Sequence, residues 1–162
     1  MKFFNFGGQK MSSQVFQAEI IRELKQESPR EEIQRCYPIM RELRPHLEEH
    51  LFADQVLQQM KEGYRLACLE EGNEIRALAG FRILTFLAWG KTLYIDDLIT
   101  APKARRRGCG GNLLKWAVNQ VRLVNCDQVH LDSGPQRHEA HRLYLNHGMK
   151  IIGYHFALDF KQ

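Results

Sequence analysis

The sequence predicts one mixed α/β domain (α+β class) with the element order β–α–α–β–β–β–α–β–α–β. Three observations predict it. Segments with helical spacing come early in the chain, apolar strand-like segments separated by short turns follow, and a glycine-rich turn then opens an amphipathic helix. A chain of 162 residues with 44% hydrophobic residues can bury one sizeable core. We expect residues 1–12 to be a flexible lead-in and residues 13–162 to form the domain.

The N-terminal third is expected to hold one strand and two helices. Phe16–Leu24 mixes apolar and polar residues as a strand does. Ser28–Glu31 is a capping box with proline at the first helical position, so it starts a helix, which Pro38 should kink or interrupt. The second helix runs from Phe52 to Glu62 and stops at Gly63. The first helix carries apolar residues at helical spacing: Ile33, Cys36, Tyr37, Met40 and Leu43.

A β meander is expected in the middle of the chain. Its strands are Tyr64–Glu70, Ile75–Phe86 and Thr92–Thr100, each rich in apolar residues. Glu71–Glu74 provides the first tight turn and Trp89–Lys91 the second. Ala101 to Arg107 is then a polar connection to the next helix.

The last third alternates helices with strands. A short strand is expected at Gln128–Asp132, and a short helix at Glu139–His147 that Gly148 ends as a C-terminal cap. We expect Ile151–Phe160 to close the sheet as its last strand. The helix after the glycines carries one apolar stripe: Leu113, Leu114, Ala117, Val118, Val121 and Val124.

The stretch Arg105–Gly111 is the strongest functional signal, because three arginines run directly into the glycine-rich helix start. The first N–H groups of a helix attract anions, glycines allow close approach of the backbone, and guanidinium groups bind phosphate. A kinase-type phosphate loop is excluded, since its lysine is missing, and a dinucleotide fingerprint is excluded, since Leu113 replaces its third glycine. A solvated basic turn is the alternative to a phosphate cradle.

Three blocks in order resemble the GNAT-type N-acetyltransferases. Arg105-x-x-Gly108-x-Gly110 matches the Q/R-x-x-G-x-G/A signature. Ala140–Met149 resembles the family's A-x-x-F-Y-x-x-x-G-F block, and Leu98–Pro102 resembles its L-x-V-x-P strand end. The resemblance covers the chain from about residue 16 to the C-terminus. It implies a mostly antiparallel central sheet flanked by helices.

The resemblance implies a site for acetyl coenzyme A, with no metal. The glycine turn would surround the pyrophosphate, and the preceding strand would offer its backbone to the pantetheine arm and an N–H group to the thioester carbonyl. Arg137 stands where the family often has an asparagine, and Met149 where it has phenylalanine. The implied cofactor-binding residues are Leu98, Ile99, Thr100, Arg105, Arg106, Arg107, Gly108, Cys109, Gly110, Gly111, Asn112 and Arg137.

The same resemblance implies an acid and a base. Tyr144 matches the tyrosine that protonates the departing thiolate, a suitable role for a phenol with a pKa of about 10. The alternative is an aromatic side chain that only packs. Asp96 and Asp97 are candidates for the base that deprotonates the amine, and strand alternation predicts that they point to opposite faces of the sheet. The alternative is a hydrogen-bond acceptor at the strand end.

Other classes of function receive little support. His46–His50 matches the HxxEH pattern of some zinc peptidases, but no third ligand follows it, and solvent-exposed positions explain His138 and His141 better than a metal does. The formal charge of +4 is too small to predict a nucleic-acid surface. No apolar run approaches the roughly 20 residues of a membrane helix. We therefore expect a cytoplasmic protein with neither nucleic acid nor membrane as a partner.

The sequence thus predicts transfer of an acetyl group from acetyl coenzyme A to a primary amine by direct attack in a ternary complex. The acceptor would be a small molecule or a peptide, and a homodimer is compatible with the family. The alternative is a module of the same fold that binds coenzyme A without catalysis, as a sensor or a partner domain.

Overall fold

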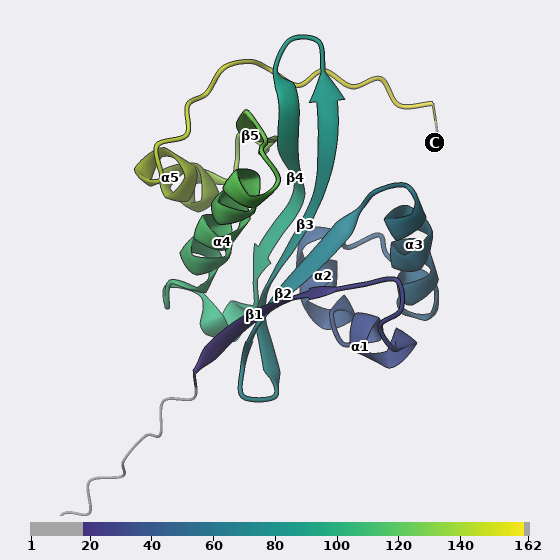
Figure 1. The fold of residues 1–162 in the computed structure, drawn as a ribbon. Coiled ribbons are helices and arrows are strands. Elements are labelled where there is room, and N and C mark those ends of the chain that lie inside the picture. Colours follow the sequence, from purple (N-terminus) through teal and green to yellow (C-terminus); the bar gives the residue numbers. More distant parts are fainter. Residues whose placement is uncertain (1–17, 161–162) are drawn as a thin grey trace, which may run out of the picture.

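The computed structural model describes residues 18–160, in which five strands form one sheet that follows the order of the sequence (Figure 1). The first four strands pair antiparallel, and the last two pair parallel. This mixed sheet confirms the predicted fold class. The strands are β1 (Glu19–Leu24), β2 (Arg65–Glu71), β3 (Glu74–Phe86), β4 (Gly90–Thr100) and β5 (Gln128–Leu131).

Helices cover both faces of the sheet (Figure 1). On one face lie α1 (Arg30–Gln34), α2 (Tyr37–Leu43) and α3 (Glu49–Lys61). On the other lie α4 (Cys109–Leu123) and α5 (His138–Asn146), with a short 3₁₀ turn, η1 (Pro102–Ala104), between β4 and α4. None of the helices in residues 18–160 has the length and apolar character to cross a membrane.

The predicted interruption of the first helix is confirmed. The chain turns at Arg35 and Cys36, and Pro38 lies in the first turn of α2. Proline is tolerated there because its missing N–H would have no partner within the helix. The break lets two short helices follow the curved sheet.

The sheet separates two apolar cores, and strand alternation distributes the residues of β3 between them. Leu78 packs toward α1–α3, whereas Ala79 and Phe81 pack toward α4. Both cores are fully enclosed in the middle of the sheet, where these side chains have no exposed area.

The predicted last strand is wrong for the described structure. Residues 151–160 follow α5 as an extended segment outside the sheet (Figure 1, yellow). Alternation alone makes a segment suitable for a strand, but a strand also needs an edge to pair with. The part of the predicted first strand that falls on residues 16–17 lies outside the described residues.

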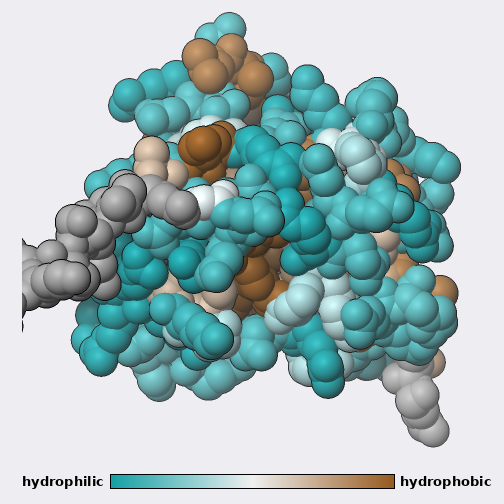
Figure 2. Space-filling model, turned by 90° about the horizontal axis from the view of Figure 1, so that it is seen from below, coloured by the Kyte–Doolittle hydropathy of each residue, from teal (hydrophilic) through white to brown (hydrophobic). Residues whose placement is uncertain are grey.

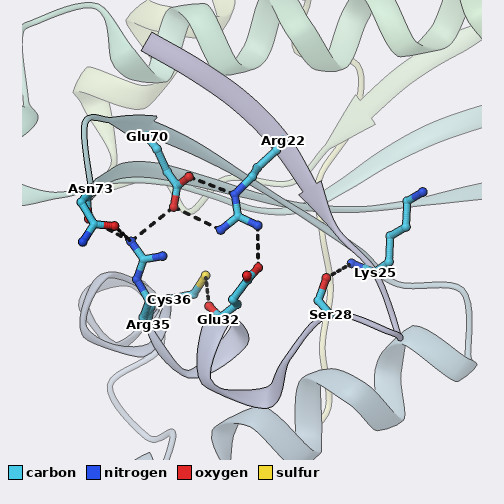
Figure 3. A network of polar contacts seen from close by, with 8 residues as sticks. All are labelled: Arg22, Lys25, Ser28, Glu32, Arg35, Cys36, Glu70 and Asn73. Atoms are coloured by element: carbon cyan, nitrogen blue, oxygen red, sulfur yellow. Dashed lines mark hydrogen bonds and ion pairs between the residues drawn. The ribbon is translucent and has the colours of Figure 1, made fainter. Parts of the chain in front are cut away.

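A charged network links β1 and β2 to α1 (Figure 3). The Arg22 guanidinium donates to Glu70 at 2.9 Å and to Glu32 at 2.6 Å, and Arg35 lies 3.4 Å from Glu70. The Glu70 side chain is only 14% exposed. The hydrogen bond from Arg22 lowers the pKa of Glu70 below its ordinary 4.5. The ionised form of Glu70 therefore stabilises the packing of α1 on the sheet.

We predict that Glu70→Gln lowers the free energy of unfolding at pH 7 by about 1.5–3 kcal/mol, the usual value of a hydrogen bond to a charged group. Because the folded state depresses the pKa of Glu70, its contribution is complete above pH 4.5 and is lost as the pH falls below it. Urea unfolding at several pH values should show the two proteins converging in acid. Glu74→Gln removes an exposed carboxylate and is the control, with a cost of about 0.5 kcal/mol or less. A pH-independent difference for Glu70→Gln would contradict the assignment.

Candidate active site at the start of α4

The predicted glycine cradle lies between η1 and α4. Arg106 and Gly108 both have left-handed backbone, with φ of 62° and 89°, so the chain turns sharply before the helix. The Asn112 N–H donates to the Gly108 carbonyl at 2.9 Å and makes the first bond of the helix. The N–H groups of Gly110 and Gly111 therefore precede the helical ladder and are available to an anion.

Glycine is required here by close neighbours as well as by the turn. A Cβ atom at Gly110 would lie 2.9 Å from the Thr100 hydroxyl, whereas one at Gly111 would make ordinary contacts of about 3.5 Å with His147. Leu143 lies within 3.7 Å of both Cβ positions. The end of β4 and the helix α5 thus close on the first turn of α4, and a side chain at Gly110 would fill the space between them.

Two of the three arginines before the glycines have acidic partners. The Arg107 guanidinium donates to both carboxylate oxygens of Glu71 at 3.0 Å, and Arg105 lies 3.9 Å from Glu42. Both side chains are about half exposed, at 46% and 51%. They give the cradle a positive field, but acidic partners already neutralise part of it.

Two other predicted cofactor residues have a partner in β1. The Asn112 amide donates to Glu19 at 2.7 Å, and the Cys109 thiol lies 3.6 Å from the other oxygen of the same carboxylate. A carboxylate beside the start of a helix is stabilised by the helix dipole. The side chains of Cys109 and Asn112 therefore connect the start of α4 to β1. Only the backbone groups of these two residues would be available to bind a phosphate.

The sheet opens next to the cradle. The pairing of β4 with β5 ends at Ile95 and Leu131, so β4 residues 96–100 have no strand on that edge in the described part of the chain. Ser133, just beyond β5, has a buried hydroxyl without a hydrogen-bond partner among the described residues. Seen from the end where α4 starts, the surface is mostly hydrophilic, with hydrophobic side chains visible in a central hollow (Figure 2). The backbone groups of β4 residues 96–100 thus border the opening, and the buried Ser133 hydroxyl lies just beyond β5.

A β-bulge in β4 changes where the two aspartates point. Gly80 pairs with Asp97 and Phe81 pairs with Ile95, which leaves Asp96 as an extra residue on β4. The prediction of opposite faces is therefore wrong. Both carboxylates contact residues of the α1–α3 side of the sheet, because the extra residue shifts the alternation by one.

Asp97 is held firmly in place. Its carboxylate accepts from Arg44 Nε at 2.8 Å and from the Tyr64 hydroxyl at 2.9 Å, and its side chain is 12% exposed. Arg44 also donates to the Asp96 carbonyl at 2.9 Å, so it binds the backbone of the bulge as well. A Cβ atom at Gly80 would lie 1.9 Å from the Tyr64 hydroxyl, so glycine makes room for this contact. Asp97 acts here as a structural acceptor.

Asp96 is more accessible than Asp97. Its side chain is 27% exposed, and its carboxylate accepts from Arg82 Nε at 3.1 Å. Burial raises the pKa of Asp96, with Asp97 adding to the effect and Arg82 opposing it. A raised pKa makes the Asp96 carboxylate a stronger proton acceptor than an ordinary aspartate.

Tyr144 lies on α5 and packs against the core on the α4 side of the sheet. Burial raises the pKa of its phenol, and the charge of Arg137 opposes that shift. The phenol is therefore protonated at neutral pH and can donate. Tyr144 packs on the α4 side of the sheet, whereas Asp96 contacts Arg82 on the α1–α3 side.

A groove lies near the cradle, on the side of the sheet that α1–α3 cover. It has a volume of about 610 Å³ and lies along α2 and the start of α3. Glu42, at its wall, is the ion-pair partner of Arg105. The groove combines two carboxylates with an aromatic ring and one guanidinium, and its lining residues are Tyr37, Pro38, Arg41, Glu42, Pro45 and Glu49.

Sequence reasoning missed five residues that shape the site. A glycine inside a strand is a recognised signal for close approach or a bulge, so Gly80 could have been found. The others carry no local signal, since only the fold brings them to the aspartates or the opening. They are Arg44, Tyr64, Arg82 and Ser133.

The two histidine pairs considered as metal ligands belong to no group of three or more potential ligands in the part of the chain that the structure describes. His46 lies in the loop between α2 and α3, and His50 lies on α3 beside Glu48 at 3.7 Å. His138 and His141 pack edge to face on α5. No group of three or more potential metal ligands occurs among residues 18–160.

Comparison with known proteins gives one consistent family. Residues 26–149 match the acetyltransferase (GNAT) family. The chain is 37% identical over 135 residues to the Bacillus subtilis protein "Uncharacterized N-acetyltransferase YhdJ", covering 82% of this chain and 95% of that protein. It is 32% identical over 63 residues to the "Aminoalkylphosphonate N-acetyltransferase" of Salmonella typhimurium, covering 39% of this chain and 41% of that protein.

Solved structures share the fold at low sequence identity. A transcriptional regulator from Bacillus halodurans aligns with a TM-score of 0.76 at 20% identity, over 88% of this chain and 100% of that one. A GNAT family acetyltransferase from Staphylococcus aureus aligns with a TM-score of 0.72 at 19% identity, over 88% and 98%. An aminoglycoside N-acetyltransferase in complex with coenzyme A aligns with a TM-score of 0.68 at 12% identity, over 88% and 97%.

Proposed function

Because the chain belongs to the acetyltransferase (GNAT) family and is an N-acetyltransferase, we propose that it transfers the acetyl group of acetyl coenzyme A to a primary amine by direct attack in a ternary complex. The observation that carries the proposal is the opening between β4 and β5 beside the glycine start of α4. An anion-binding helix start next to an unpaired strand edge suits a long cosubstrate with a pyrophosphate at one end and a thioester at the other.

The pyrophosphate would lie at the start of α4. The N–H groups of Gly110 and Gly111 would donate to it, with the exposed arginines adding charge. The close contact between Thr100 and Gly110 supports this assignment, because only a residue without Cβ leaves room there. Arg106 is exposed and lies between the two arginines that pair with carboxylates. Its guanidinium would bind the second phosphate.

The pantetheine arm would follow the free edge of β4. Leu98, Ile99 and Thr100 present main-chain donors and acceptors along it. An N–H group in this stretch would donate to the thioester carbonyl as negative charge develops on the oxygen. Ser133 lies just beyond β5, and we propose that its buried hydroxyl, which has no hydrogen-bond partner among residues 18–160, binds the pantetheine arm or the acceptor.

We assign the base to Asp96 and the acid to Tyr144. Asp96 would accept the proton of the attacking ammonium group, directly or through one water, since it is partly exposed and its pKa is raised. Asp97 is already committed to Arg44 and Tyr64. Tyr144 would protonate the departing thiolate as the tetrahedral intermediate collapses, and Arg137 would modulate the acidity of that phenol.

The acceptor would enter from the groove along α2 and α3. Glu42 and Glu49 suit a cationic amine, and Tyr37 offers an apolar wall. Named relatives and neighbours act on different amines, among them aminoalkylphosphonates and aminoglycosides. We propose a primary amine on a small molecule or a peptide as the acceptor. A cytoplasmic location belongs to the same proposal, and the four free cysteines support it.

A coenzyme A-binding module without catalysis is the second candidate. One structure with this fold is named a transcriptional regulator, so the fold also occurs in proteins with that name. Release of coenzyme A thiol across a broad panel of amines tests the difference. Thiol release that depends on an amine supports the enzyme, whereas tight cosubstrate binding with no release for any amine supports the module.

The cradle predicts that acetyl coenzyme A stabilises the chain against heat. At 100 times its dissociation constant a ligand adds about 2.7 kcal/mol, which raises the midpoint by several degrees. Gly110→Val should abolish most of this shift, because its side chain collides with Thr100 and fills the cradle. Gly111→Ala meets only ordinary contacts and is the matched control. An equal shift in all three proteins would remove the pyrophosphate assignment.

The acid role predicts that Tyr144→Phe lowers kcat by about 10²-fold or more, the lower range for general acid catalysis. Affinity for acetyl coenzyme A, measured by calorimetry, should remain within a factor of about 3, because packing of the ring is kept. Tyr154→Phe removes an exposed hydroxyl elsewhere and is the control. A kcat of the wild-type size in Tyr144→Phe would leave this residue with a packing role only.

The base role predicts different outcomes for the two aspartates. Asp96→Asn should lower kcat/KM by about 10²-fold or more while the fold persists. In the wild type kcat/KM falls as the pH drops through the pKa of Asp96, which lies above the ordinary 3.8, and this limb should vanish in the variant. Asp97→Asn should act mainly on stability, because Arg44 loses its anionic partner. Equal kcat/KM for Asp96→Asn and wild type would exclude Asp96 as the base.

A further inference from the structure

Arg82 of β3 is held by contacts with β4 and with the end of α3. Its Nε donates to the Asp96 carboxylate at 3.1 Å, and its Nη2 donates to the Gln59 side chain at 3.0 Å. Its Nη1 donates to the Glu62 carbonyl at 3.4 Å. The guanidinium also lies over the Tyr64 ring, 5.4 Å from its centre. All three nitrogens of the guanidinium therefore have partners, and this planar group is held in one orientation.

The position of Arg82 suits a positive charge. The C-terminal end of a helix carries a partial negative charge, and Glu62 is the C-cap of α3. The Arg82 side chain is 22% exposed, so water and salt screen these interactions less than they would at an open surface. Arg82 is therefore a fixed cation beside the bulge of β4.

Arg82 occupies only one oxygen of the Asp96 carboxylate. The bond goes to Oδ2, and no donor among residues 18–160 bonds the other oxygen, Oδ1. The enclosed side-chain oxygen that lacks a partner in that range belongs to Ser133, so solvent reaches Oδ1 of Asp96. A carboxylate that is held by one oxygen keeps its orientation and leaves the other oxygen able to accept a proton.

The neighbouring aspartate has an arginine of its own. Arg44 Nε donates to the Asp97 carboxylate at 2.8 Å, whereas Arg82 donates to Asp96. Tyr64 contacts both pairs, because its hydroxyl donates to Asp97 and its ring lies against the guanidinium of Arg82. The two carboxylates therefore do not compete for one cation, and each keeps its own partner.

We propose that Arg82 is a positioning residue for acetyl transfer, which holds Asp96 by Oδ2 so that Oδ1 accepts the proton of the acceptor amine. This inference rests on the base role proposed for Asp96. Arg82 would act through Asp96, without a bond to the amine or to the cosubstrate. Because a displacement of about 1 Å can cost about 10²-fold in rate, the bonds that fix the guanidinium belong to the proposal as much as its charge does.

The charges around Asp96 determine what the loss of Arg82 does to its protonation. Burial raises the pKa of Asp96, and Arg82 is the charge that opposes this rise most. The neighbouring aspartate adds to the rise, the second arginine opposes it, and two buried phenols with raised pKa values stay neutral. Without the cation of Arg82 the pKa of Asp96 rises further, so kcat/KM begins to fall at a higher pH on the acid side. The other titratable groups near Asp96 are Asp97, Arg44, Tyr64 and Tyr94.

The pH profile of kcat/KM in Arg82→Gln tests the proposal. The plateau should fall about 10-fold, because Asp96 loses its fixed orientation. The acid limb should move to higher pH by about one pH unit, the lower end of the effect of a neighbouring opposite charge. Arg65→Gln is the matched control, since Arg65 pairs with Glu23 and lies over the Phe81 ring on the α4 side of the sheet. It should change neither the plateau nor the limb.

Arg82→Lys separates the charge from the fixed geometry. Lysine keeps a cation beside Asp96 but lacks the planar group with three bonded nitrogens. The acid limb should therefore stay near its wild-type position while part of the loss in the plateau remains. A wild-type plateau in Arg82→Lys would overturn the proposal, even if Arg82→Gln does not fold. The same limb in Arg82→Lys as in Arg82→Gln would overturn it as well.

NMR of the labelled carboxyl carbon of Asp96 follows the same protonation without turnover, and Asp96→Asn identifies its signal. The titration should move to higher pH in Arg82→Gln and stay unchanged in Arg65→Gln. An unmoved titration in a folded Arg82→Gln protein would overturn the contact between Arg82 and Asp96, whatever the activity. A moved titration with no acid limb in kcat/KM would instead remove the base role of Asp96. The failure of this inference and the failure of the proposed function are thus distinguishable.

Discussion

The extra residue at Asp96 in β4 is the constraint from which the site follows. It brings two neighbouring carboxylates to the same face of the sheet. It also lies where β4 leaves β5, so the strand edge beyond it is free. Arg44 binds the Asp96 carbonyl and the Asp97 carboxylate together, and Gly80 makes room for the hydroxyl of Tyr64. Without these contacts a bulge with two adjacent negative charges would be costly.

The two aspartates differ in their hydrogen-bond donors and in their exposure. Asp97 has two strong donors and is almost enclosed, so its charge stabilises the bulge. Asp96 accepts from one donor and remains partly exposed, so its carboxylate is more accessible than that of Asp97. The cradle shows a similar division, because acidic neighbours occupy Arg105 and Arg107 while the backbone at Gly110 stays free. Side chains build the site, and the main chain offers most of its binding groups.

Much of the fold could be predicted from local signals. Turns and helical spacing located the helices and the five observed strands within a few residues of their observed ends, although the predicted capping box does not form, because Ser28 accepts from the Lys25 N–H instead. The glycine turn was placed correctly because left-handed backbone at Gly108 has a direct sequence signature. The faces of Asp96 and Asp97 could not be predicted, since a bulge depends on the register between β3 and β4, and alternation assumes a regular ladder.

By itself the sequence determined the family and most of the elements, and it predicted a phosphate cradle at Arg105–Gly111, because short-range chemistry and spacing encode these features. Only the tertiary structure decided which aspartate is the more exposed, that Tyr64 and Arg44 bind the other, and that the Ser133 hydroxyl is buried without a hydrogen-bond partner among residues 18–160. It also decided that Ile151–Phe160 does not pair in its own sheet. The physical reason is common to all of these. Pairing partners and neighbours far apart in the chain are set by packing, and no local pattern specifies them.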